Sequence, residues 1–177
     1  MRATGIVRRI DDLGRVVIPK ELRRTMRIRE GEPLEIFTSG DGDVVFRKYS
    51  TVGEISGFAA KYAQVLYGAL KLPVLICDRD AVCAAHPAKK KELVGKRLSD
   101  QLDKSLNKRE TTISDEGIFC LNDYKERACV VSPIQSGGDV VGCIAVLRTA
   151  EDSAPLSEKD LFIVETATKL LGAQTEE

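Results

Sequence analysis

Apolar and polar positions alternate along the first 50 residues in the way that short β-strands require. Residues 4–9 and 15–18 are rich in β-branched side chains and flank residues 11–14, whose Asp-Asp-Leu-Gly sequence is typical of a tight turn. A second pair of segments, residues 34–37 and 44–48, flanks a connection rich in glycine and aspartate. Two β-hairpins are therefore predicted.

A short helix is predicted between the two hairpins. Pro19 suits the first helical position, where its missing amide hydrogen is not needed, and Glu21 lies favourably near the positive N-terminus. The helical sequence continues for about two turns until Glu30-Gly31 ends it. The first 50 residues are thus expected to fold as β-β-α-β-β.

Such a small piece of chain cannot bury much apolar surface by itself. Its first predicted strand places Ile6, Arg8 and Ile10 on one face, and Val7 and Arg9 on the other. Neither face is purely apolar, so a sheet with one buried face would be frustrated. We expect two copies of the chain to complete a shared core.

The pattern changes at Thr51 to that of a long amphipathic helix. Thr51 and Glu54 have the T-x-x-E spacing of a capping box, and the apolar positions that follow recur at helical intervals. These positions are Ile55, Phe58, Ala59, Tyr62, Val65, Leu66 and Ala69. The helix is expected to connect two regions of the chain.

The rest of the sequence predicts an antiparallel sheet with flanking helices. Strands are expected at residues 73–78, 82–85, about 117–121, 128–135 and 139–148, with polar helical segments around 89–106. Ser136-Gly137-Gly138 predicts a hairpin between the last two strands. Lys89-Lys90-Lys91 is expected to be the solvated start of a helix. The fold class is therefore α+β.

A final helix is predicted after residue 156. Ser157 is its expected cap and Gly172 its expected end. One stripe of this helix carries Leu161, Val164, Thr168 and Leu171. We expect the two long helices to pack together.

Charge changes the picture of the first region. The chain carries 27 lysines and arginines and 27 acids, yet its first 29 residues contain nine cations and only three acids. These cations are Arg2, Arg8, Arg9, Arg15, Lys20, Arg23, Arg24, Arg27 and Arg29. Such an excess is typical of a protein that binds a polyanion, most often nucleic acid.

Candidate contact residues follow from where these cations fall. Four of them have the spacing i, i+3, i+4 and i+7 and form one helical stripe, and three others flank the first turn. The predicted DNA-binding residues are Arg8, Arg9, Arg15, Lys20, Arg23, Arg24 and Arg27. The alternative is a solvated helix face, but acids are nearly missing from the stripe. Arginine also binds phosphate and guanine with two parallel hydrogen bonds.

The sequence TGIVRRIDDLGRVVIPKELRRTMRIREGEPLEIF, followed by VVFRKY, resembles the AbrB family of bacterial transition-state regulators across residues 3–49. The resemblance implies an intertwined dimer called a swapped-hairpin β-barrel, in which loop and helix arginines bind DNA. By position, those arginines are Arg8, Arg15, Arg23 and Arg24. The second region resembles a GAF domain, a fold that either holds a small molecule or serves for dimerisation, and both roles stay open.

Taken whole, the chain is similar to two-domain sporulation regulators of this family. The similarity implies a transcription factor, both activator and repressor, in the cytoplasm of the forespore. We expect a DNA-binding domain at residues 1–50, a linker at 51–55 and a GAF-like domain at 56–177. The expected partners are double-stranded DNA, further copies of the chain in a dimer or a tetramer of two dimers, and an unidentified small-molecule effector.

Catalytic and metal-binding chemistry finds little support in the sequence. His86, the only histidine, forms a C-x-x-H pair with Cys83, but no second pair of zinc ligands is near. Neither Cys83 nor Ser99 lies in a nucleophile elbow. We expect no enzyme activity, no cofactor and no metal. Apolar runs are too short to span a bilayer, which takes about 20 residues.

The five cysteines are Cys77, Cys83, Cys120, Cys129 and Cys143, and we expect them to be reduced and mostly buried. A redox switch through Cys77, Cys83 or Cys120 would require an exposed thiol of low pKa. Two other functions stay open for the whole chain. Related swapped-hairpin proteins are antitoxins that hold a toxin with a disordered tail, although a folded region stands there in this chain. The other alternative is a signalling enzyme or a pure metabolite sensor.

Overall fold

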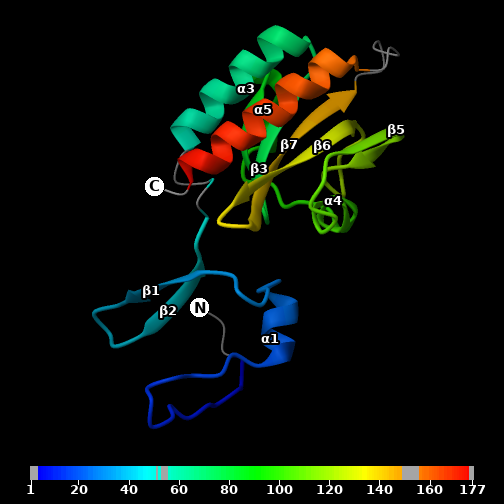
Figure 1. The fold of residues 1–177 in the computed structure, drawn as a ribbon. Coiled ribbons are helices and arrows are strands. Elements are labelled where there is room, and N and C mark those ends of the chain that lie inside the picture. Colours follow the sequence, from blue (N-terminus) through cyan, green and yellow to red (C-terminus); the bar gives the residue numbers. More distant parts are fainter. Residues whose placement is uncertain (1–3, 51, 53–55, 149–155, 176–177) are drawn as a thin grey trace. The chain divides into compact units, whose positions relative to one another are not determined.

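The computed structural model describes residues 4–50, 52, 56–148 and 156–175 (Figure 1). The chain forms two compact units, Met1–Tyr49 and Ser50–Glu177.

The first unit contains the predicted second hairpin. Strands β1 (Leu34–Thr38) and β2 (Val44–Lys48) pair antiparallel from Leu34 opposite Lys48 to Thr38 opposite Val44. The connection is closed by Ser39, whose amide donates to the carbonyl of Asp43 at 3.0 Å and whose hydroxyl accepts from the amide of Asp43 at 3.1 Å. This prediction is confirmed.

The first hairpin forms only its turn. The amide of Asp11 donates to the carbonyl of Arg15 and that of Gly14 to the carbonyl of Asp11, both at 3.1 Å, and Gly14 has a φ of 78°. Residues 4–9 and 15–18 are not strands in the single chain, so this part of the prediction is wrong for one protomer. The physical reason is that Val7, Ile10 and Val17 are exposed in the single chain, so no core holds the two segments together as an isolated two-stranded sheet.

The second unit is an antiparallel sheet with helices on both faces. The sheet order is β4-β3-β7-β6-β5. Its strands are β3 (Val74–Asp78), β4 (Val82–His86), β5 (Thr112–Phe119), β6 (Arg127–Ser136) and β7 (Asp139–Arg148). The helices are α3 (Ser56–Leu70), the 3₁₀ helix η1 (Ala88–Leu93), α4 (Asp100–Leu106) and α5 (Glu158–Gln174). The α+β class and the antiparallel sheet are confirmed.

Two details of the prediction are corrected in this unit. The strand expected near residue 117 begins earlier, at Thr112, and is interrupted by an irregularity between Ile113 and Ile118. Lys90 is not solvated but buried, because its ammonium binds the hydroxyl of Tyr124 and the carboxylate of Glu126. The expected capping box at Thr51 lies outside the described residues.

The last helix begins as predicted but ends later. The hydroxyl of Ser157 accepts from the amide of Asp160 at 3.2 Å, and the Asp160 carboxylate accepts from the Ser157 amide at 3.0 Å. Helix α5 continues past Gly172 to Gln174. A Cβ on Gly172 would lie 2.1 Å from the carbonyl oxygen of Gln135. Gly172 therefore permits close packing of α5 on β6 and does not stop the helix.

Apolar side chains fill both faces of the sheet. On β3, Val74 and Ile76 face α3 and α5, whereas Leu75 and Cys77 face the side covered by α4 and η1. This explains why the strand is apolar along almost its whole length instead of alternating. Helices α3 and α5 pack against each other over the first of these faces, as predicted (Figure 1).

Candidate nucleic-acid interface

The turn of the first unit positions Arg15. The carboxylate of Asp11 accepts hydrogen bonds from the amide of Leu13 at 3.0 Å, and from the amide and Nε of Arg15, each at 2.7 Å. The amide and then the guanidinium of Arg15 hold the pKa of Asp11 below its usual value. Asp11 therefore stays ionised and orients the Arg15 guanidinium, which is largely exposed to solvent.

Helix α1 (Lys20–Thr25) presents the next cations. Pro19 precedes its first residue, one position earlier than expected, and adopts an extended ψ of 147°. Lys20 and Arg24 are exposed and Arg23 is half-buried, all within little more than one helical turn. The helix thus brings three of the predicted contact residues together.

The end of α1 excludes Arg27 from this helical stripe. The amide of Ile28 donates to the carbonyl of Arg23 at 2.7 Å and the amide of Arg27 to that of Arg24 at 3.2 Å. This is a Schellman motif, with Arg27 in the left-handed region at a φ of 52°. The prediction that four cations share one stripe is wrong, as is the expected helix end at Glu30-Gly31, because the chain turns off the helix axis at Arg27.

Two further cations hold this corner in place. The ammonium of Lys48 donates to the carbonyl of Arg27 at 2.6 Å and lies 3.4 Å from the Glu32 carboxylate. Glu32 also accepts from the amide of Arg29 at 2.7 Å. Lys48 and Arg29 fix α1 relative to β2, a role that the sequence reasoning missed. The i, i+3 spacing of Arg29 and Glu32 was the only local signal of it.

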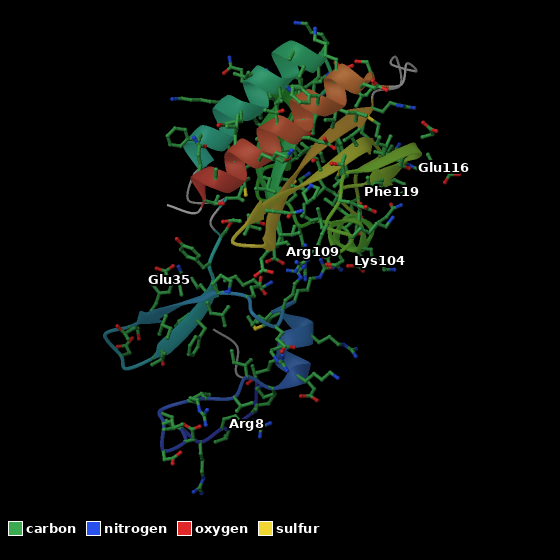
Figure 2. All side chains as sticks on the ribbon, in the orientation of Figure 1. Arg8, Glu35, Lys104, Arg109, Glu116 and Phe119 are labelled. Atoms are coloured by element: carbon green, nitrogen blue, oxygen red, sulfur yellow. The ribbon has the colours of Figure 1, made fainter. Side chains whose placement is uncertain are left out.

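The other predicted DNA-binding residues, apart from Arg15 and Arg27 discussed above, are not neutralised by acids within the described part of the chain. There, no ion pair joins an acid to the side chains of Arg8, Arg9, Lys20, Arg23 or Arg24. Arg8 and Arg9 are exposed in the segment before the turn, where Figure 2 labels Arg8. The chemical capacity of this surface is to bind a polyanion, since unpaired guanidinium groups are strong donors to phosphate oxygens.

The histidine and the cysteines serve packing in the second unit. The rings of His86 and Tyr67 lie 4.9 Å apart. All five cysteines are free thiols and four of them are buried. Burial raises the pKa of the half-buried Cys83 thiol to about 12, with the negative charge of Asp78 as a further cause. Among the described residues, no cluster of three or more candidate ligands is placed to hold a metal ion.

In the parts of the chain that the structure describes, none of the helices has the length and apolar character needed to span a bilayer.

Each of the two units matches a known protein family. Residues 54–176 match the family described as "Stage V sporulation protein T C-terminal, transcription factor". Residues 7–53 match the family described as "Antidote-toxin recognition MazE, bacterial antitoxin". The first match covers more than half of the chain, and the second covers the turn, α1 and the hairpin.

Curated relatives agree with this division. Stage V sporulation protein T of Bacillus subtilis (strain 168) is 42% identical over 181 residues, which cover 100% of both chains. The transition state regulatory protein AbrB of the same organism is 46% identical over 69 residues, covering 36% of this chain and 71% of that protein. The AbrB resemblance of the first unit is thereby confirmed.

Solved structures support the fold of the second unit alone. The GAF domain of Acinetobacter phosphoenolpyruvate-protein phosphotransferase has a TM-score of 0.58 at 12% identity, covering 71% of this chain and 87% of that chain. The GAF domain/HD domain protein of Geobacter sulfurreducens has a TM-score of 0.56 at 15% identity, covering 73% and 96%. With an AbrB-type first unit and a GAF-like second unit, the chain belongs to the stage V sporulation protein T family of transcription factors.

Proposed function

We propose that the chain regulates transcription of sporulation genes in the forespore by binding double-stranded DNA through its first unit, and that it acts by binding and not by catalysis. The observation that carries this proposal is that Arg8 and Arg9 before the turn, and the three cations of α1, have no acid partner in the described residues, while the Arg15 guanidinium is exposed beside them. The proposed contact residues are Arg8, Arg9, Arg15, Lys20, Arg23, Arg24 and Arg27. Phosphate contacts position the protein, and a minority of these arginines read base edges.

A dimer of first units is part of the proposal. Val7 is 88% exposed, and Ile10, Leu13 and Val17 are each about 70% exposed in the single chain. So many exposed apolar side chains on so small a unit indicate a surface that another chain covers. The unpaired segments 4–9 and 15–18 are supplied with neighbouring strands if two chains exchange their hairpins, as the AbrB-type swapped barrel requires. The dimer also doubles the number of cations that face DNA.

A second interface is proposed on the outer face of α3 and α5. These helices run antiparallel and side by side (Figure 1). Phe58 and Val65 lie seven residues apart on α3, Phe162 and Leu170 lie eight apart on α5, and all four are more than half exposed. Packing this face on the same face of another copy would bury both stripes in a four-helix arrangement. With two self-complementary surfaces per chain, two dimers close into a tetramer.

Measurement of molar mass by light scattering tests the second interface. Val65→Glu places a charge in the apolar stripe, whereas Gln64→Glu adds the same charge at the neighbouring exposed position and serves as control. We expect a tetramer for the wild type and for Gln64→Glu, and a dimer for Val65→Glu. A tetramer in all three proteins would contradict the proposed interface.

DNA titration tests the first unit. The full chain is added to a labelled duplex from a sporulation promoter and to a shuffled duplex, beside Arg23→Gln/Arg24→Gln. The control is Lys104→Gln/Lys108→Gln, which removes two exposed cations from the second unit. We expect the first variant to lose at least about tenfold in affinity, because the dimer loses four guanidinium groups, and the control to bind like the wild type. An equal loss of DNA affinity in both variants would contradict the proposal that the α1 arginines contact DNA.

The antitoxin alternative is favoured by the family match of residues 7–53. The second unit is folded where an antitoxin of the expected kind carries a disordered tail. Purification of the tagged chain from its own cells distinguishes the two functions. A small protein recovered at equal molar ratio, whose toxicity the chain abolishes, would favour the antitoxin.

A small-molecule effector of the second unit stays a proposal as well. The support for it is the GAF-like fold alone. Such a ligand would regulate DNA binding only if it bound one arrangement of the units more tightly than another.

A further inference from the structure

The segment that leads into the second unit is anchored at the end of strand β3. The hydroxyl of Ser50 donates to Oδ2 of Asp78 at 2.7 Å. The side chain of Val52 is fully buried. Its Cγ2 would lie 3.1 Å from a Cβ on Gly142, which is the residue opposite Asp78 on β7. Ser50 and Val52 are therefore held against the same end of the sheet.

Asp78 also shapes the turn between β3 and β4. Its Oδ1 accepts hydrogen bonds from the amides of Asp80 and Ala81, each at 2.7 Å. One carboxylate thus binds the entering segment with one oxygen and the turn with the other. The orientation of this carboxylate is therefore linked both to Ser50 and to the turn.

The turn is in addition tied to helix α4. Nη2 of Arg79 donates to Oδ1 of Asp103 at 3.0 Å and to Oδ1 of Asn107 at 2.9 Å. The Arg79 side chain is only 13% exposed. The carbonyl of Asp80 accepts from the amide of Leu98, just before α4, at 2.8 Å. Consecutive residues of one turn therefore bind the entering segment and the α4 region.

Helix α4 covers the face of the sheet opposite α3 and α5. Leu102 and Leu106 of α4 are buried there with Leu75 of β3 and Leu98. Displacing α4 by about 1 Å would stretch the Arg79 bonds beyond hydrogen-bond range unless the turn moved with it. The position of α4 and that of the turn are thus coupled.

We propose that the β3–β4 turn is a relay: it transmits a displacement of α4, through Arg79 and Asp78, to Ser50 and the segment that carries the DNA-binding unit. Arg79 and Asp78 are positioning residues in this relay and contact no DNA. The inference rests on the proposed function, since a relay to the first unit regulates something only if that unit binds DNA. It identifies a route by which a ligand or partner acting on the α4 side would change how firmly Ser50 is held at the end of β3.

Hydrogen exchange of the full chain, followed by mass spectrometry, tests the relay without DNA. The probe is the peptide that spans residues 49–58, and the variant is Arg79→Gln, which leaves Ser50 and Asp78 untouched. The matched control is Lys104→Gln, because Lys104 is an exposed cation of α4 (Figure 2). We expect exchange in the peptide to become at least about threefold faster in Arg79→Gln, as in Ser50→Ala, and to stay at the wild-type rate in Lys104→Gln.

Asn107→Ala keeps the test decisive if Arg79→Gln lowers the melting temperature of the whole unit. It removes one acceptor of Arg79 without a change of charge, and we expect a smaller acceleration in the same peptide. Wild-type exchange in Arg79→Gln and Asn107→Ala, with acceleration in Ser50→Ala alone, would overturn the relay and leave the Ser50 bond a local anchor. Since the readout needs no DNA, its failure is distinct from a failure to bind DNA.

Discussion

Replacing Gly172 by alanine should change stability in two opposite ways, through the helix propensity of α5 and through its packing on β6. Gly172 lies inside α5, where alanine is normally favoured over glycine by about 1 kcal/mol. The added Cβ would lie 2.1 Å from the carbonyl oxygen of Gln135 and 3.2 Å from its carbonyl carbon. Both are backbone atoms of β6, which pairs with β7 at this residue, so they cannot move away without disturbing the ladder between Gln135 and Val140.

The magnitude follows from the two opposing terms. Overpacking a rigid site costs about 1–3 kcal/mol, and a contact with backbone belongs at the upper end of that range. After the gain in helix propensity, we expect Gly172→Ala to destabilise the second unit by about 2 kcal/mol. For a chain of this size, that lowers the melting temperature by about 4–8 °C.

Thermal unfolding of the full chain, followed by circular dichroism, measures the effect. Gly68→Ala is the matched control, since Gly68 is an exposed glycine inside α3 and nothing lies within 4 Å of its added Cβ. We expect this control to melt about 2–4 °C higher than the wild type. If Gly172→Ala melted as high as Gly68→Ala, the close packing of α5 on β6 would be refuted.

Three further outcomes are expected. Glu126→Gln removes the carboxylate that binds the buried Lys90 ammonium, and urea unfolding should show a loss of about 2 kcal/mol; an unchanged midpoint would contradict it. Because the pKa of Cys83 is raised to about 12, iodoacetamide at pH 8 should modify native Cys83 at least about a hundredfold more slowly than the unfolded chain; equal rates would contradict this burial. Hydrogen bonds from the hydroxyl and amide of Ser157 lower the pKa of Asp160, so its stabilisation is present at neutral pH and lost as pH falls through that lowered pKa. Asp160→Asn should therefore be less stable at pH 7 by about 0.5 kcal/mol, since solvent screens this exposed carboxylate, and match the wild type near pH 2, whereas a constant difference would exclude this linkage.

Local patterns predicted those parts of the fold that local interactions determine. The hairpin at residues 34–48 was predictable because its turn chemistry and alternating strands belong to one continuous segment. The cap at Ser157 was predictable for the same reason. Strand β3 was identified as an apolar run, although its two buried faces became clear only with α3, α4 and α5 in place.

The parts that sequence could not predict depend on distant residues or on another chain. The left-handed Arg27 has no glycine to signal it, and its position depends on Lys48, 21 residues away. Lys90 was expected to be solvated because its partners, Tyr124 and Glu126, lie more than 30 residues further on. The strands expected at residues 4–9 and 15–18 do not form in the single chain, because nothing in its described part covers their apolar side chains. Of the candidate interface, charge and helical spacing predicted the grouping of Lys20, Arg23 and Arg24 on α1, but not the departure of Arg27 from the helix.

The salt dependence of DNA binding tests the central claim most directly. If the seven proposed cations of each chain act in a dimer and about half of the 14 reach phosphates, log K should fall with log salt at a slope of about −6. In Arg23→Gln/Arg24→Gln about two phosphate contacts are lost, so we expect a slope of about −4. A slope near zero for the wild type, or the same steep slope in the variant, would contradict a DNA-binding surface on α1.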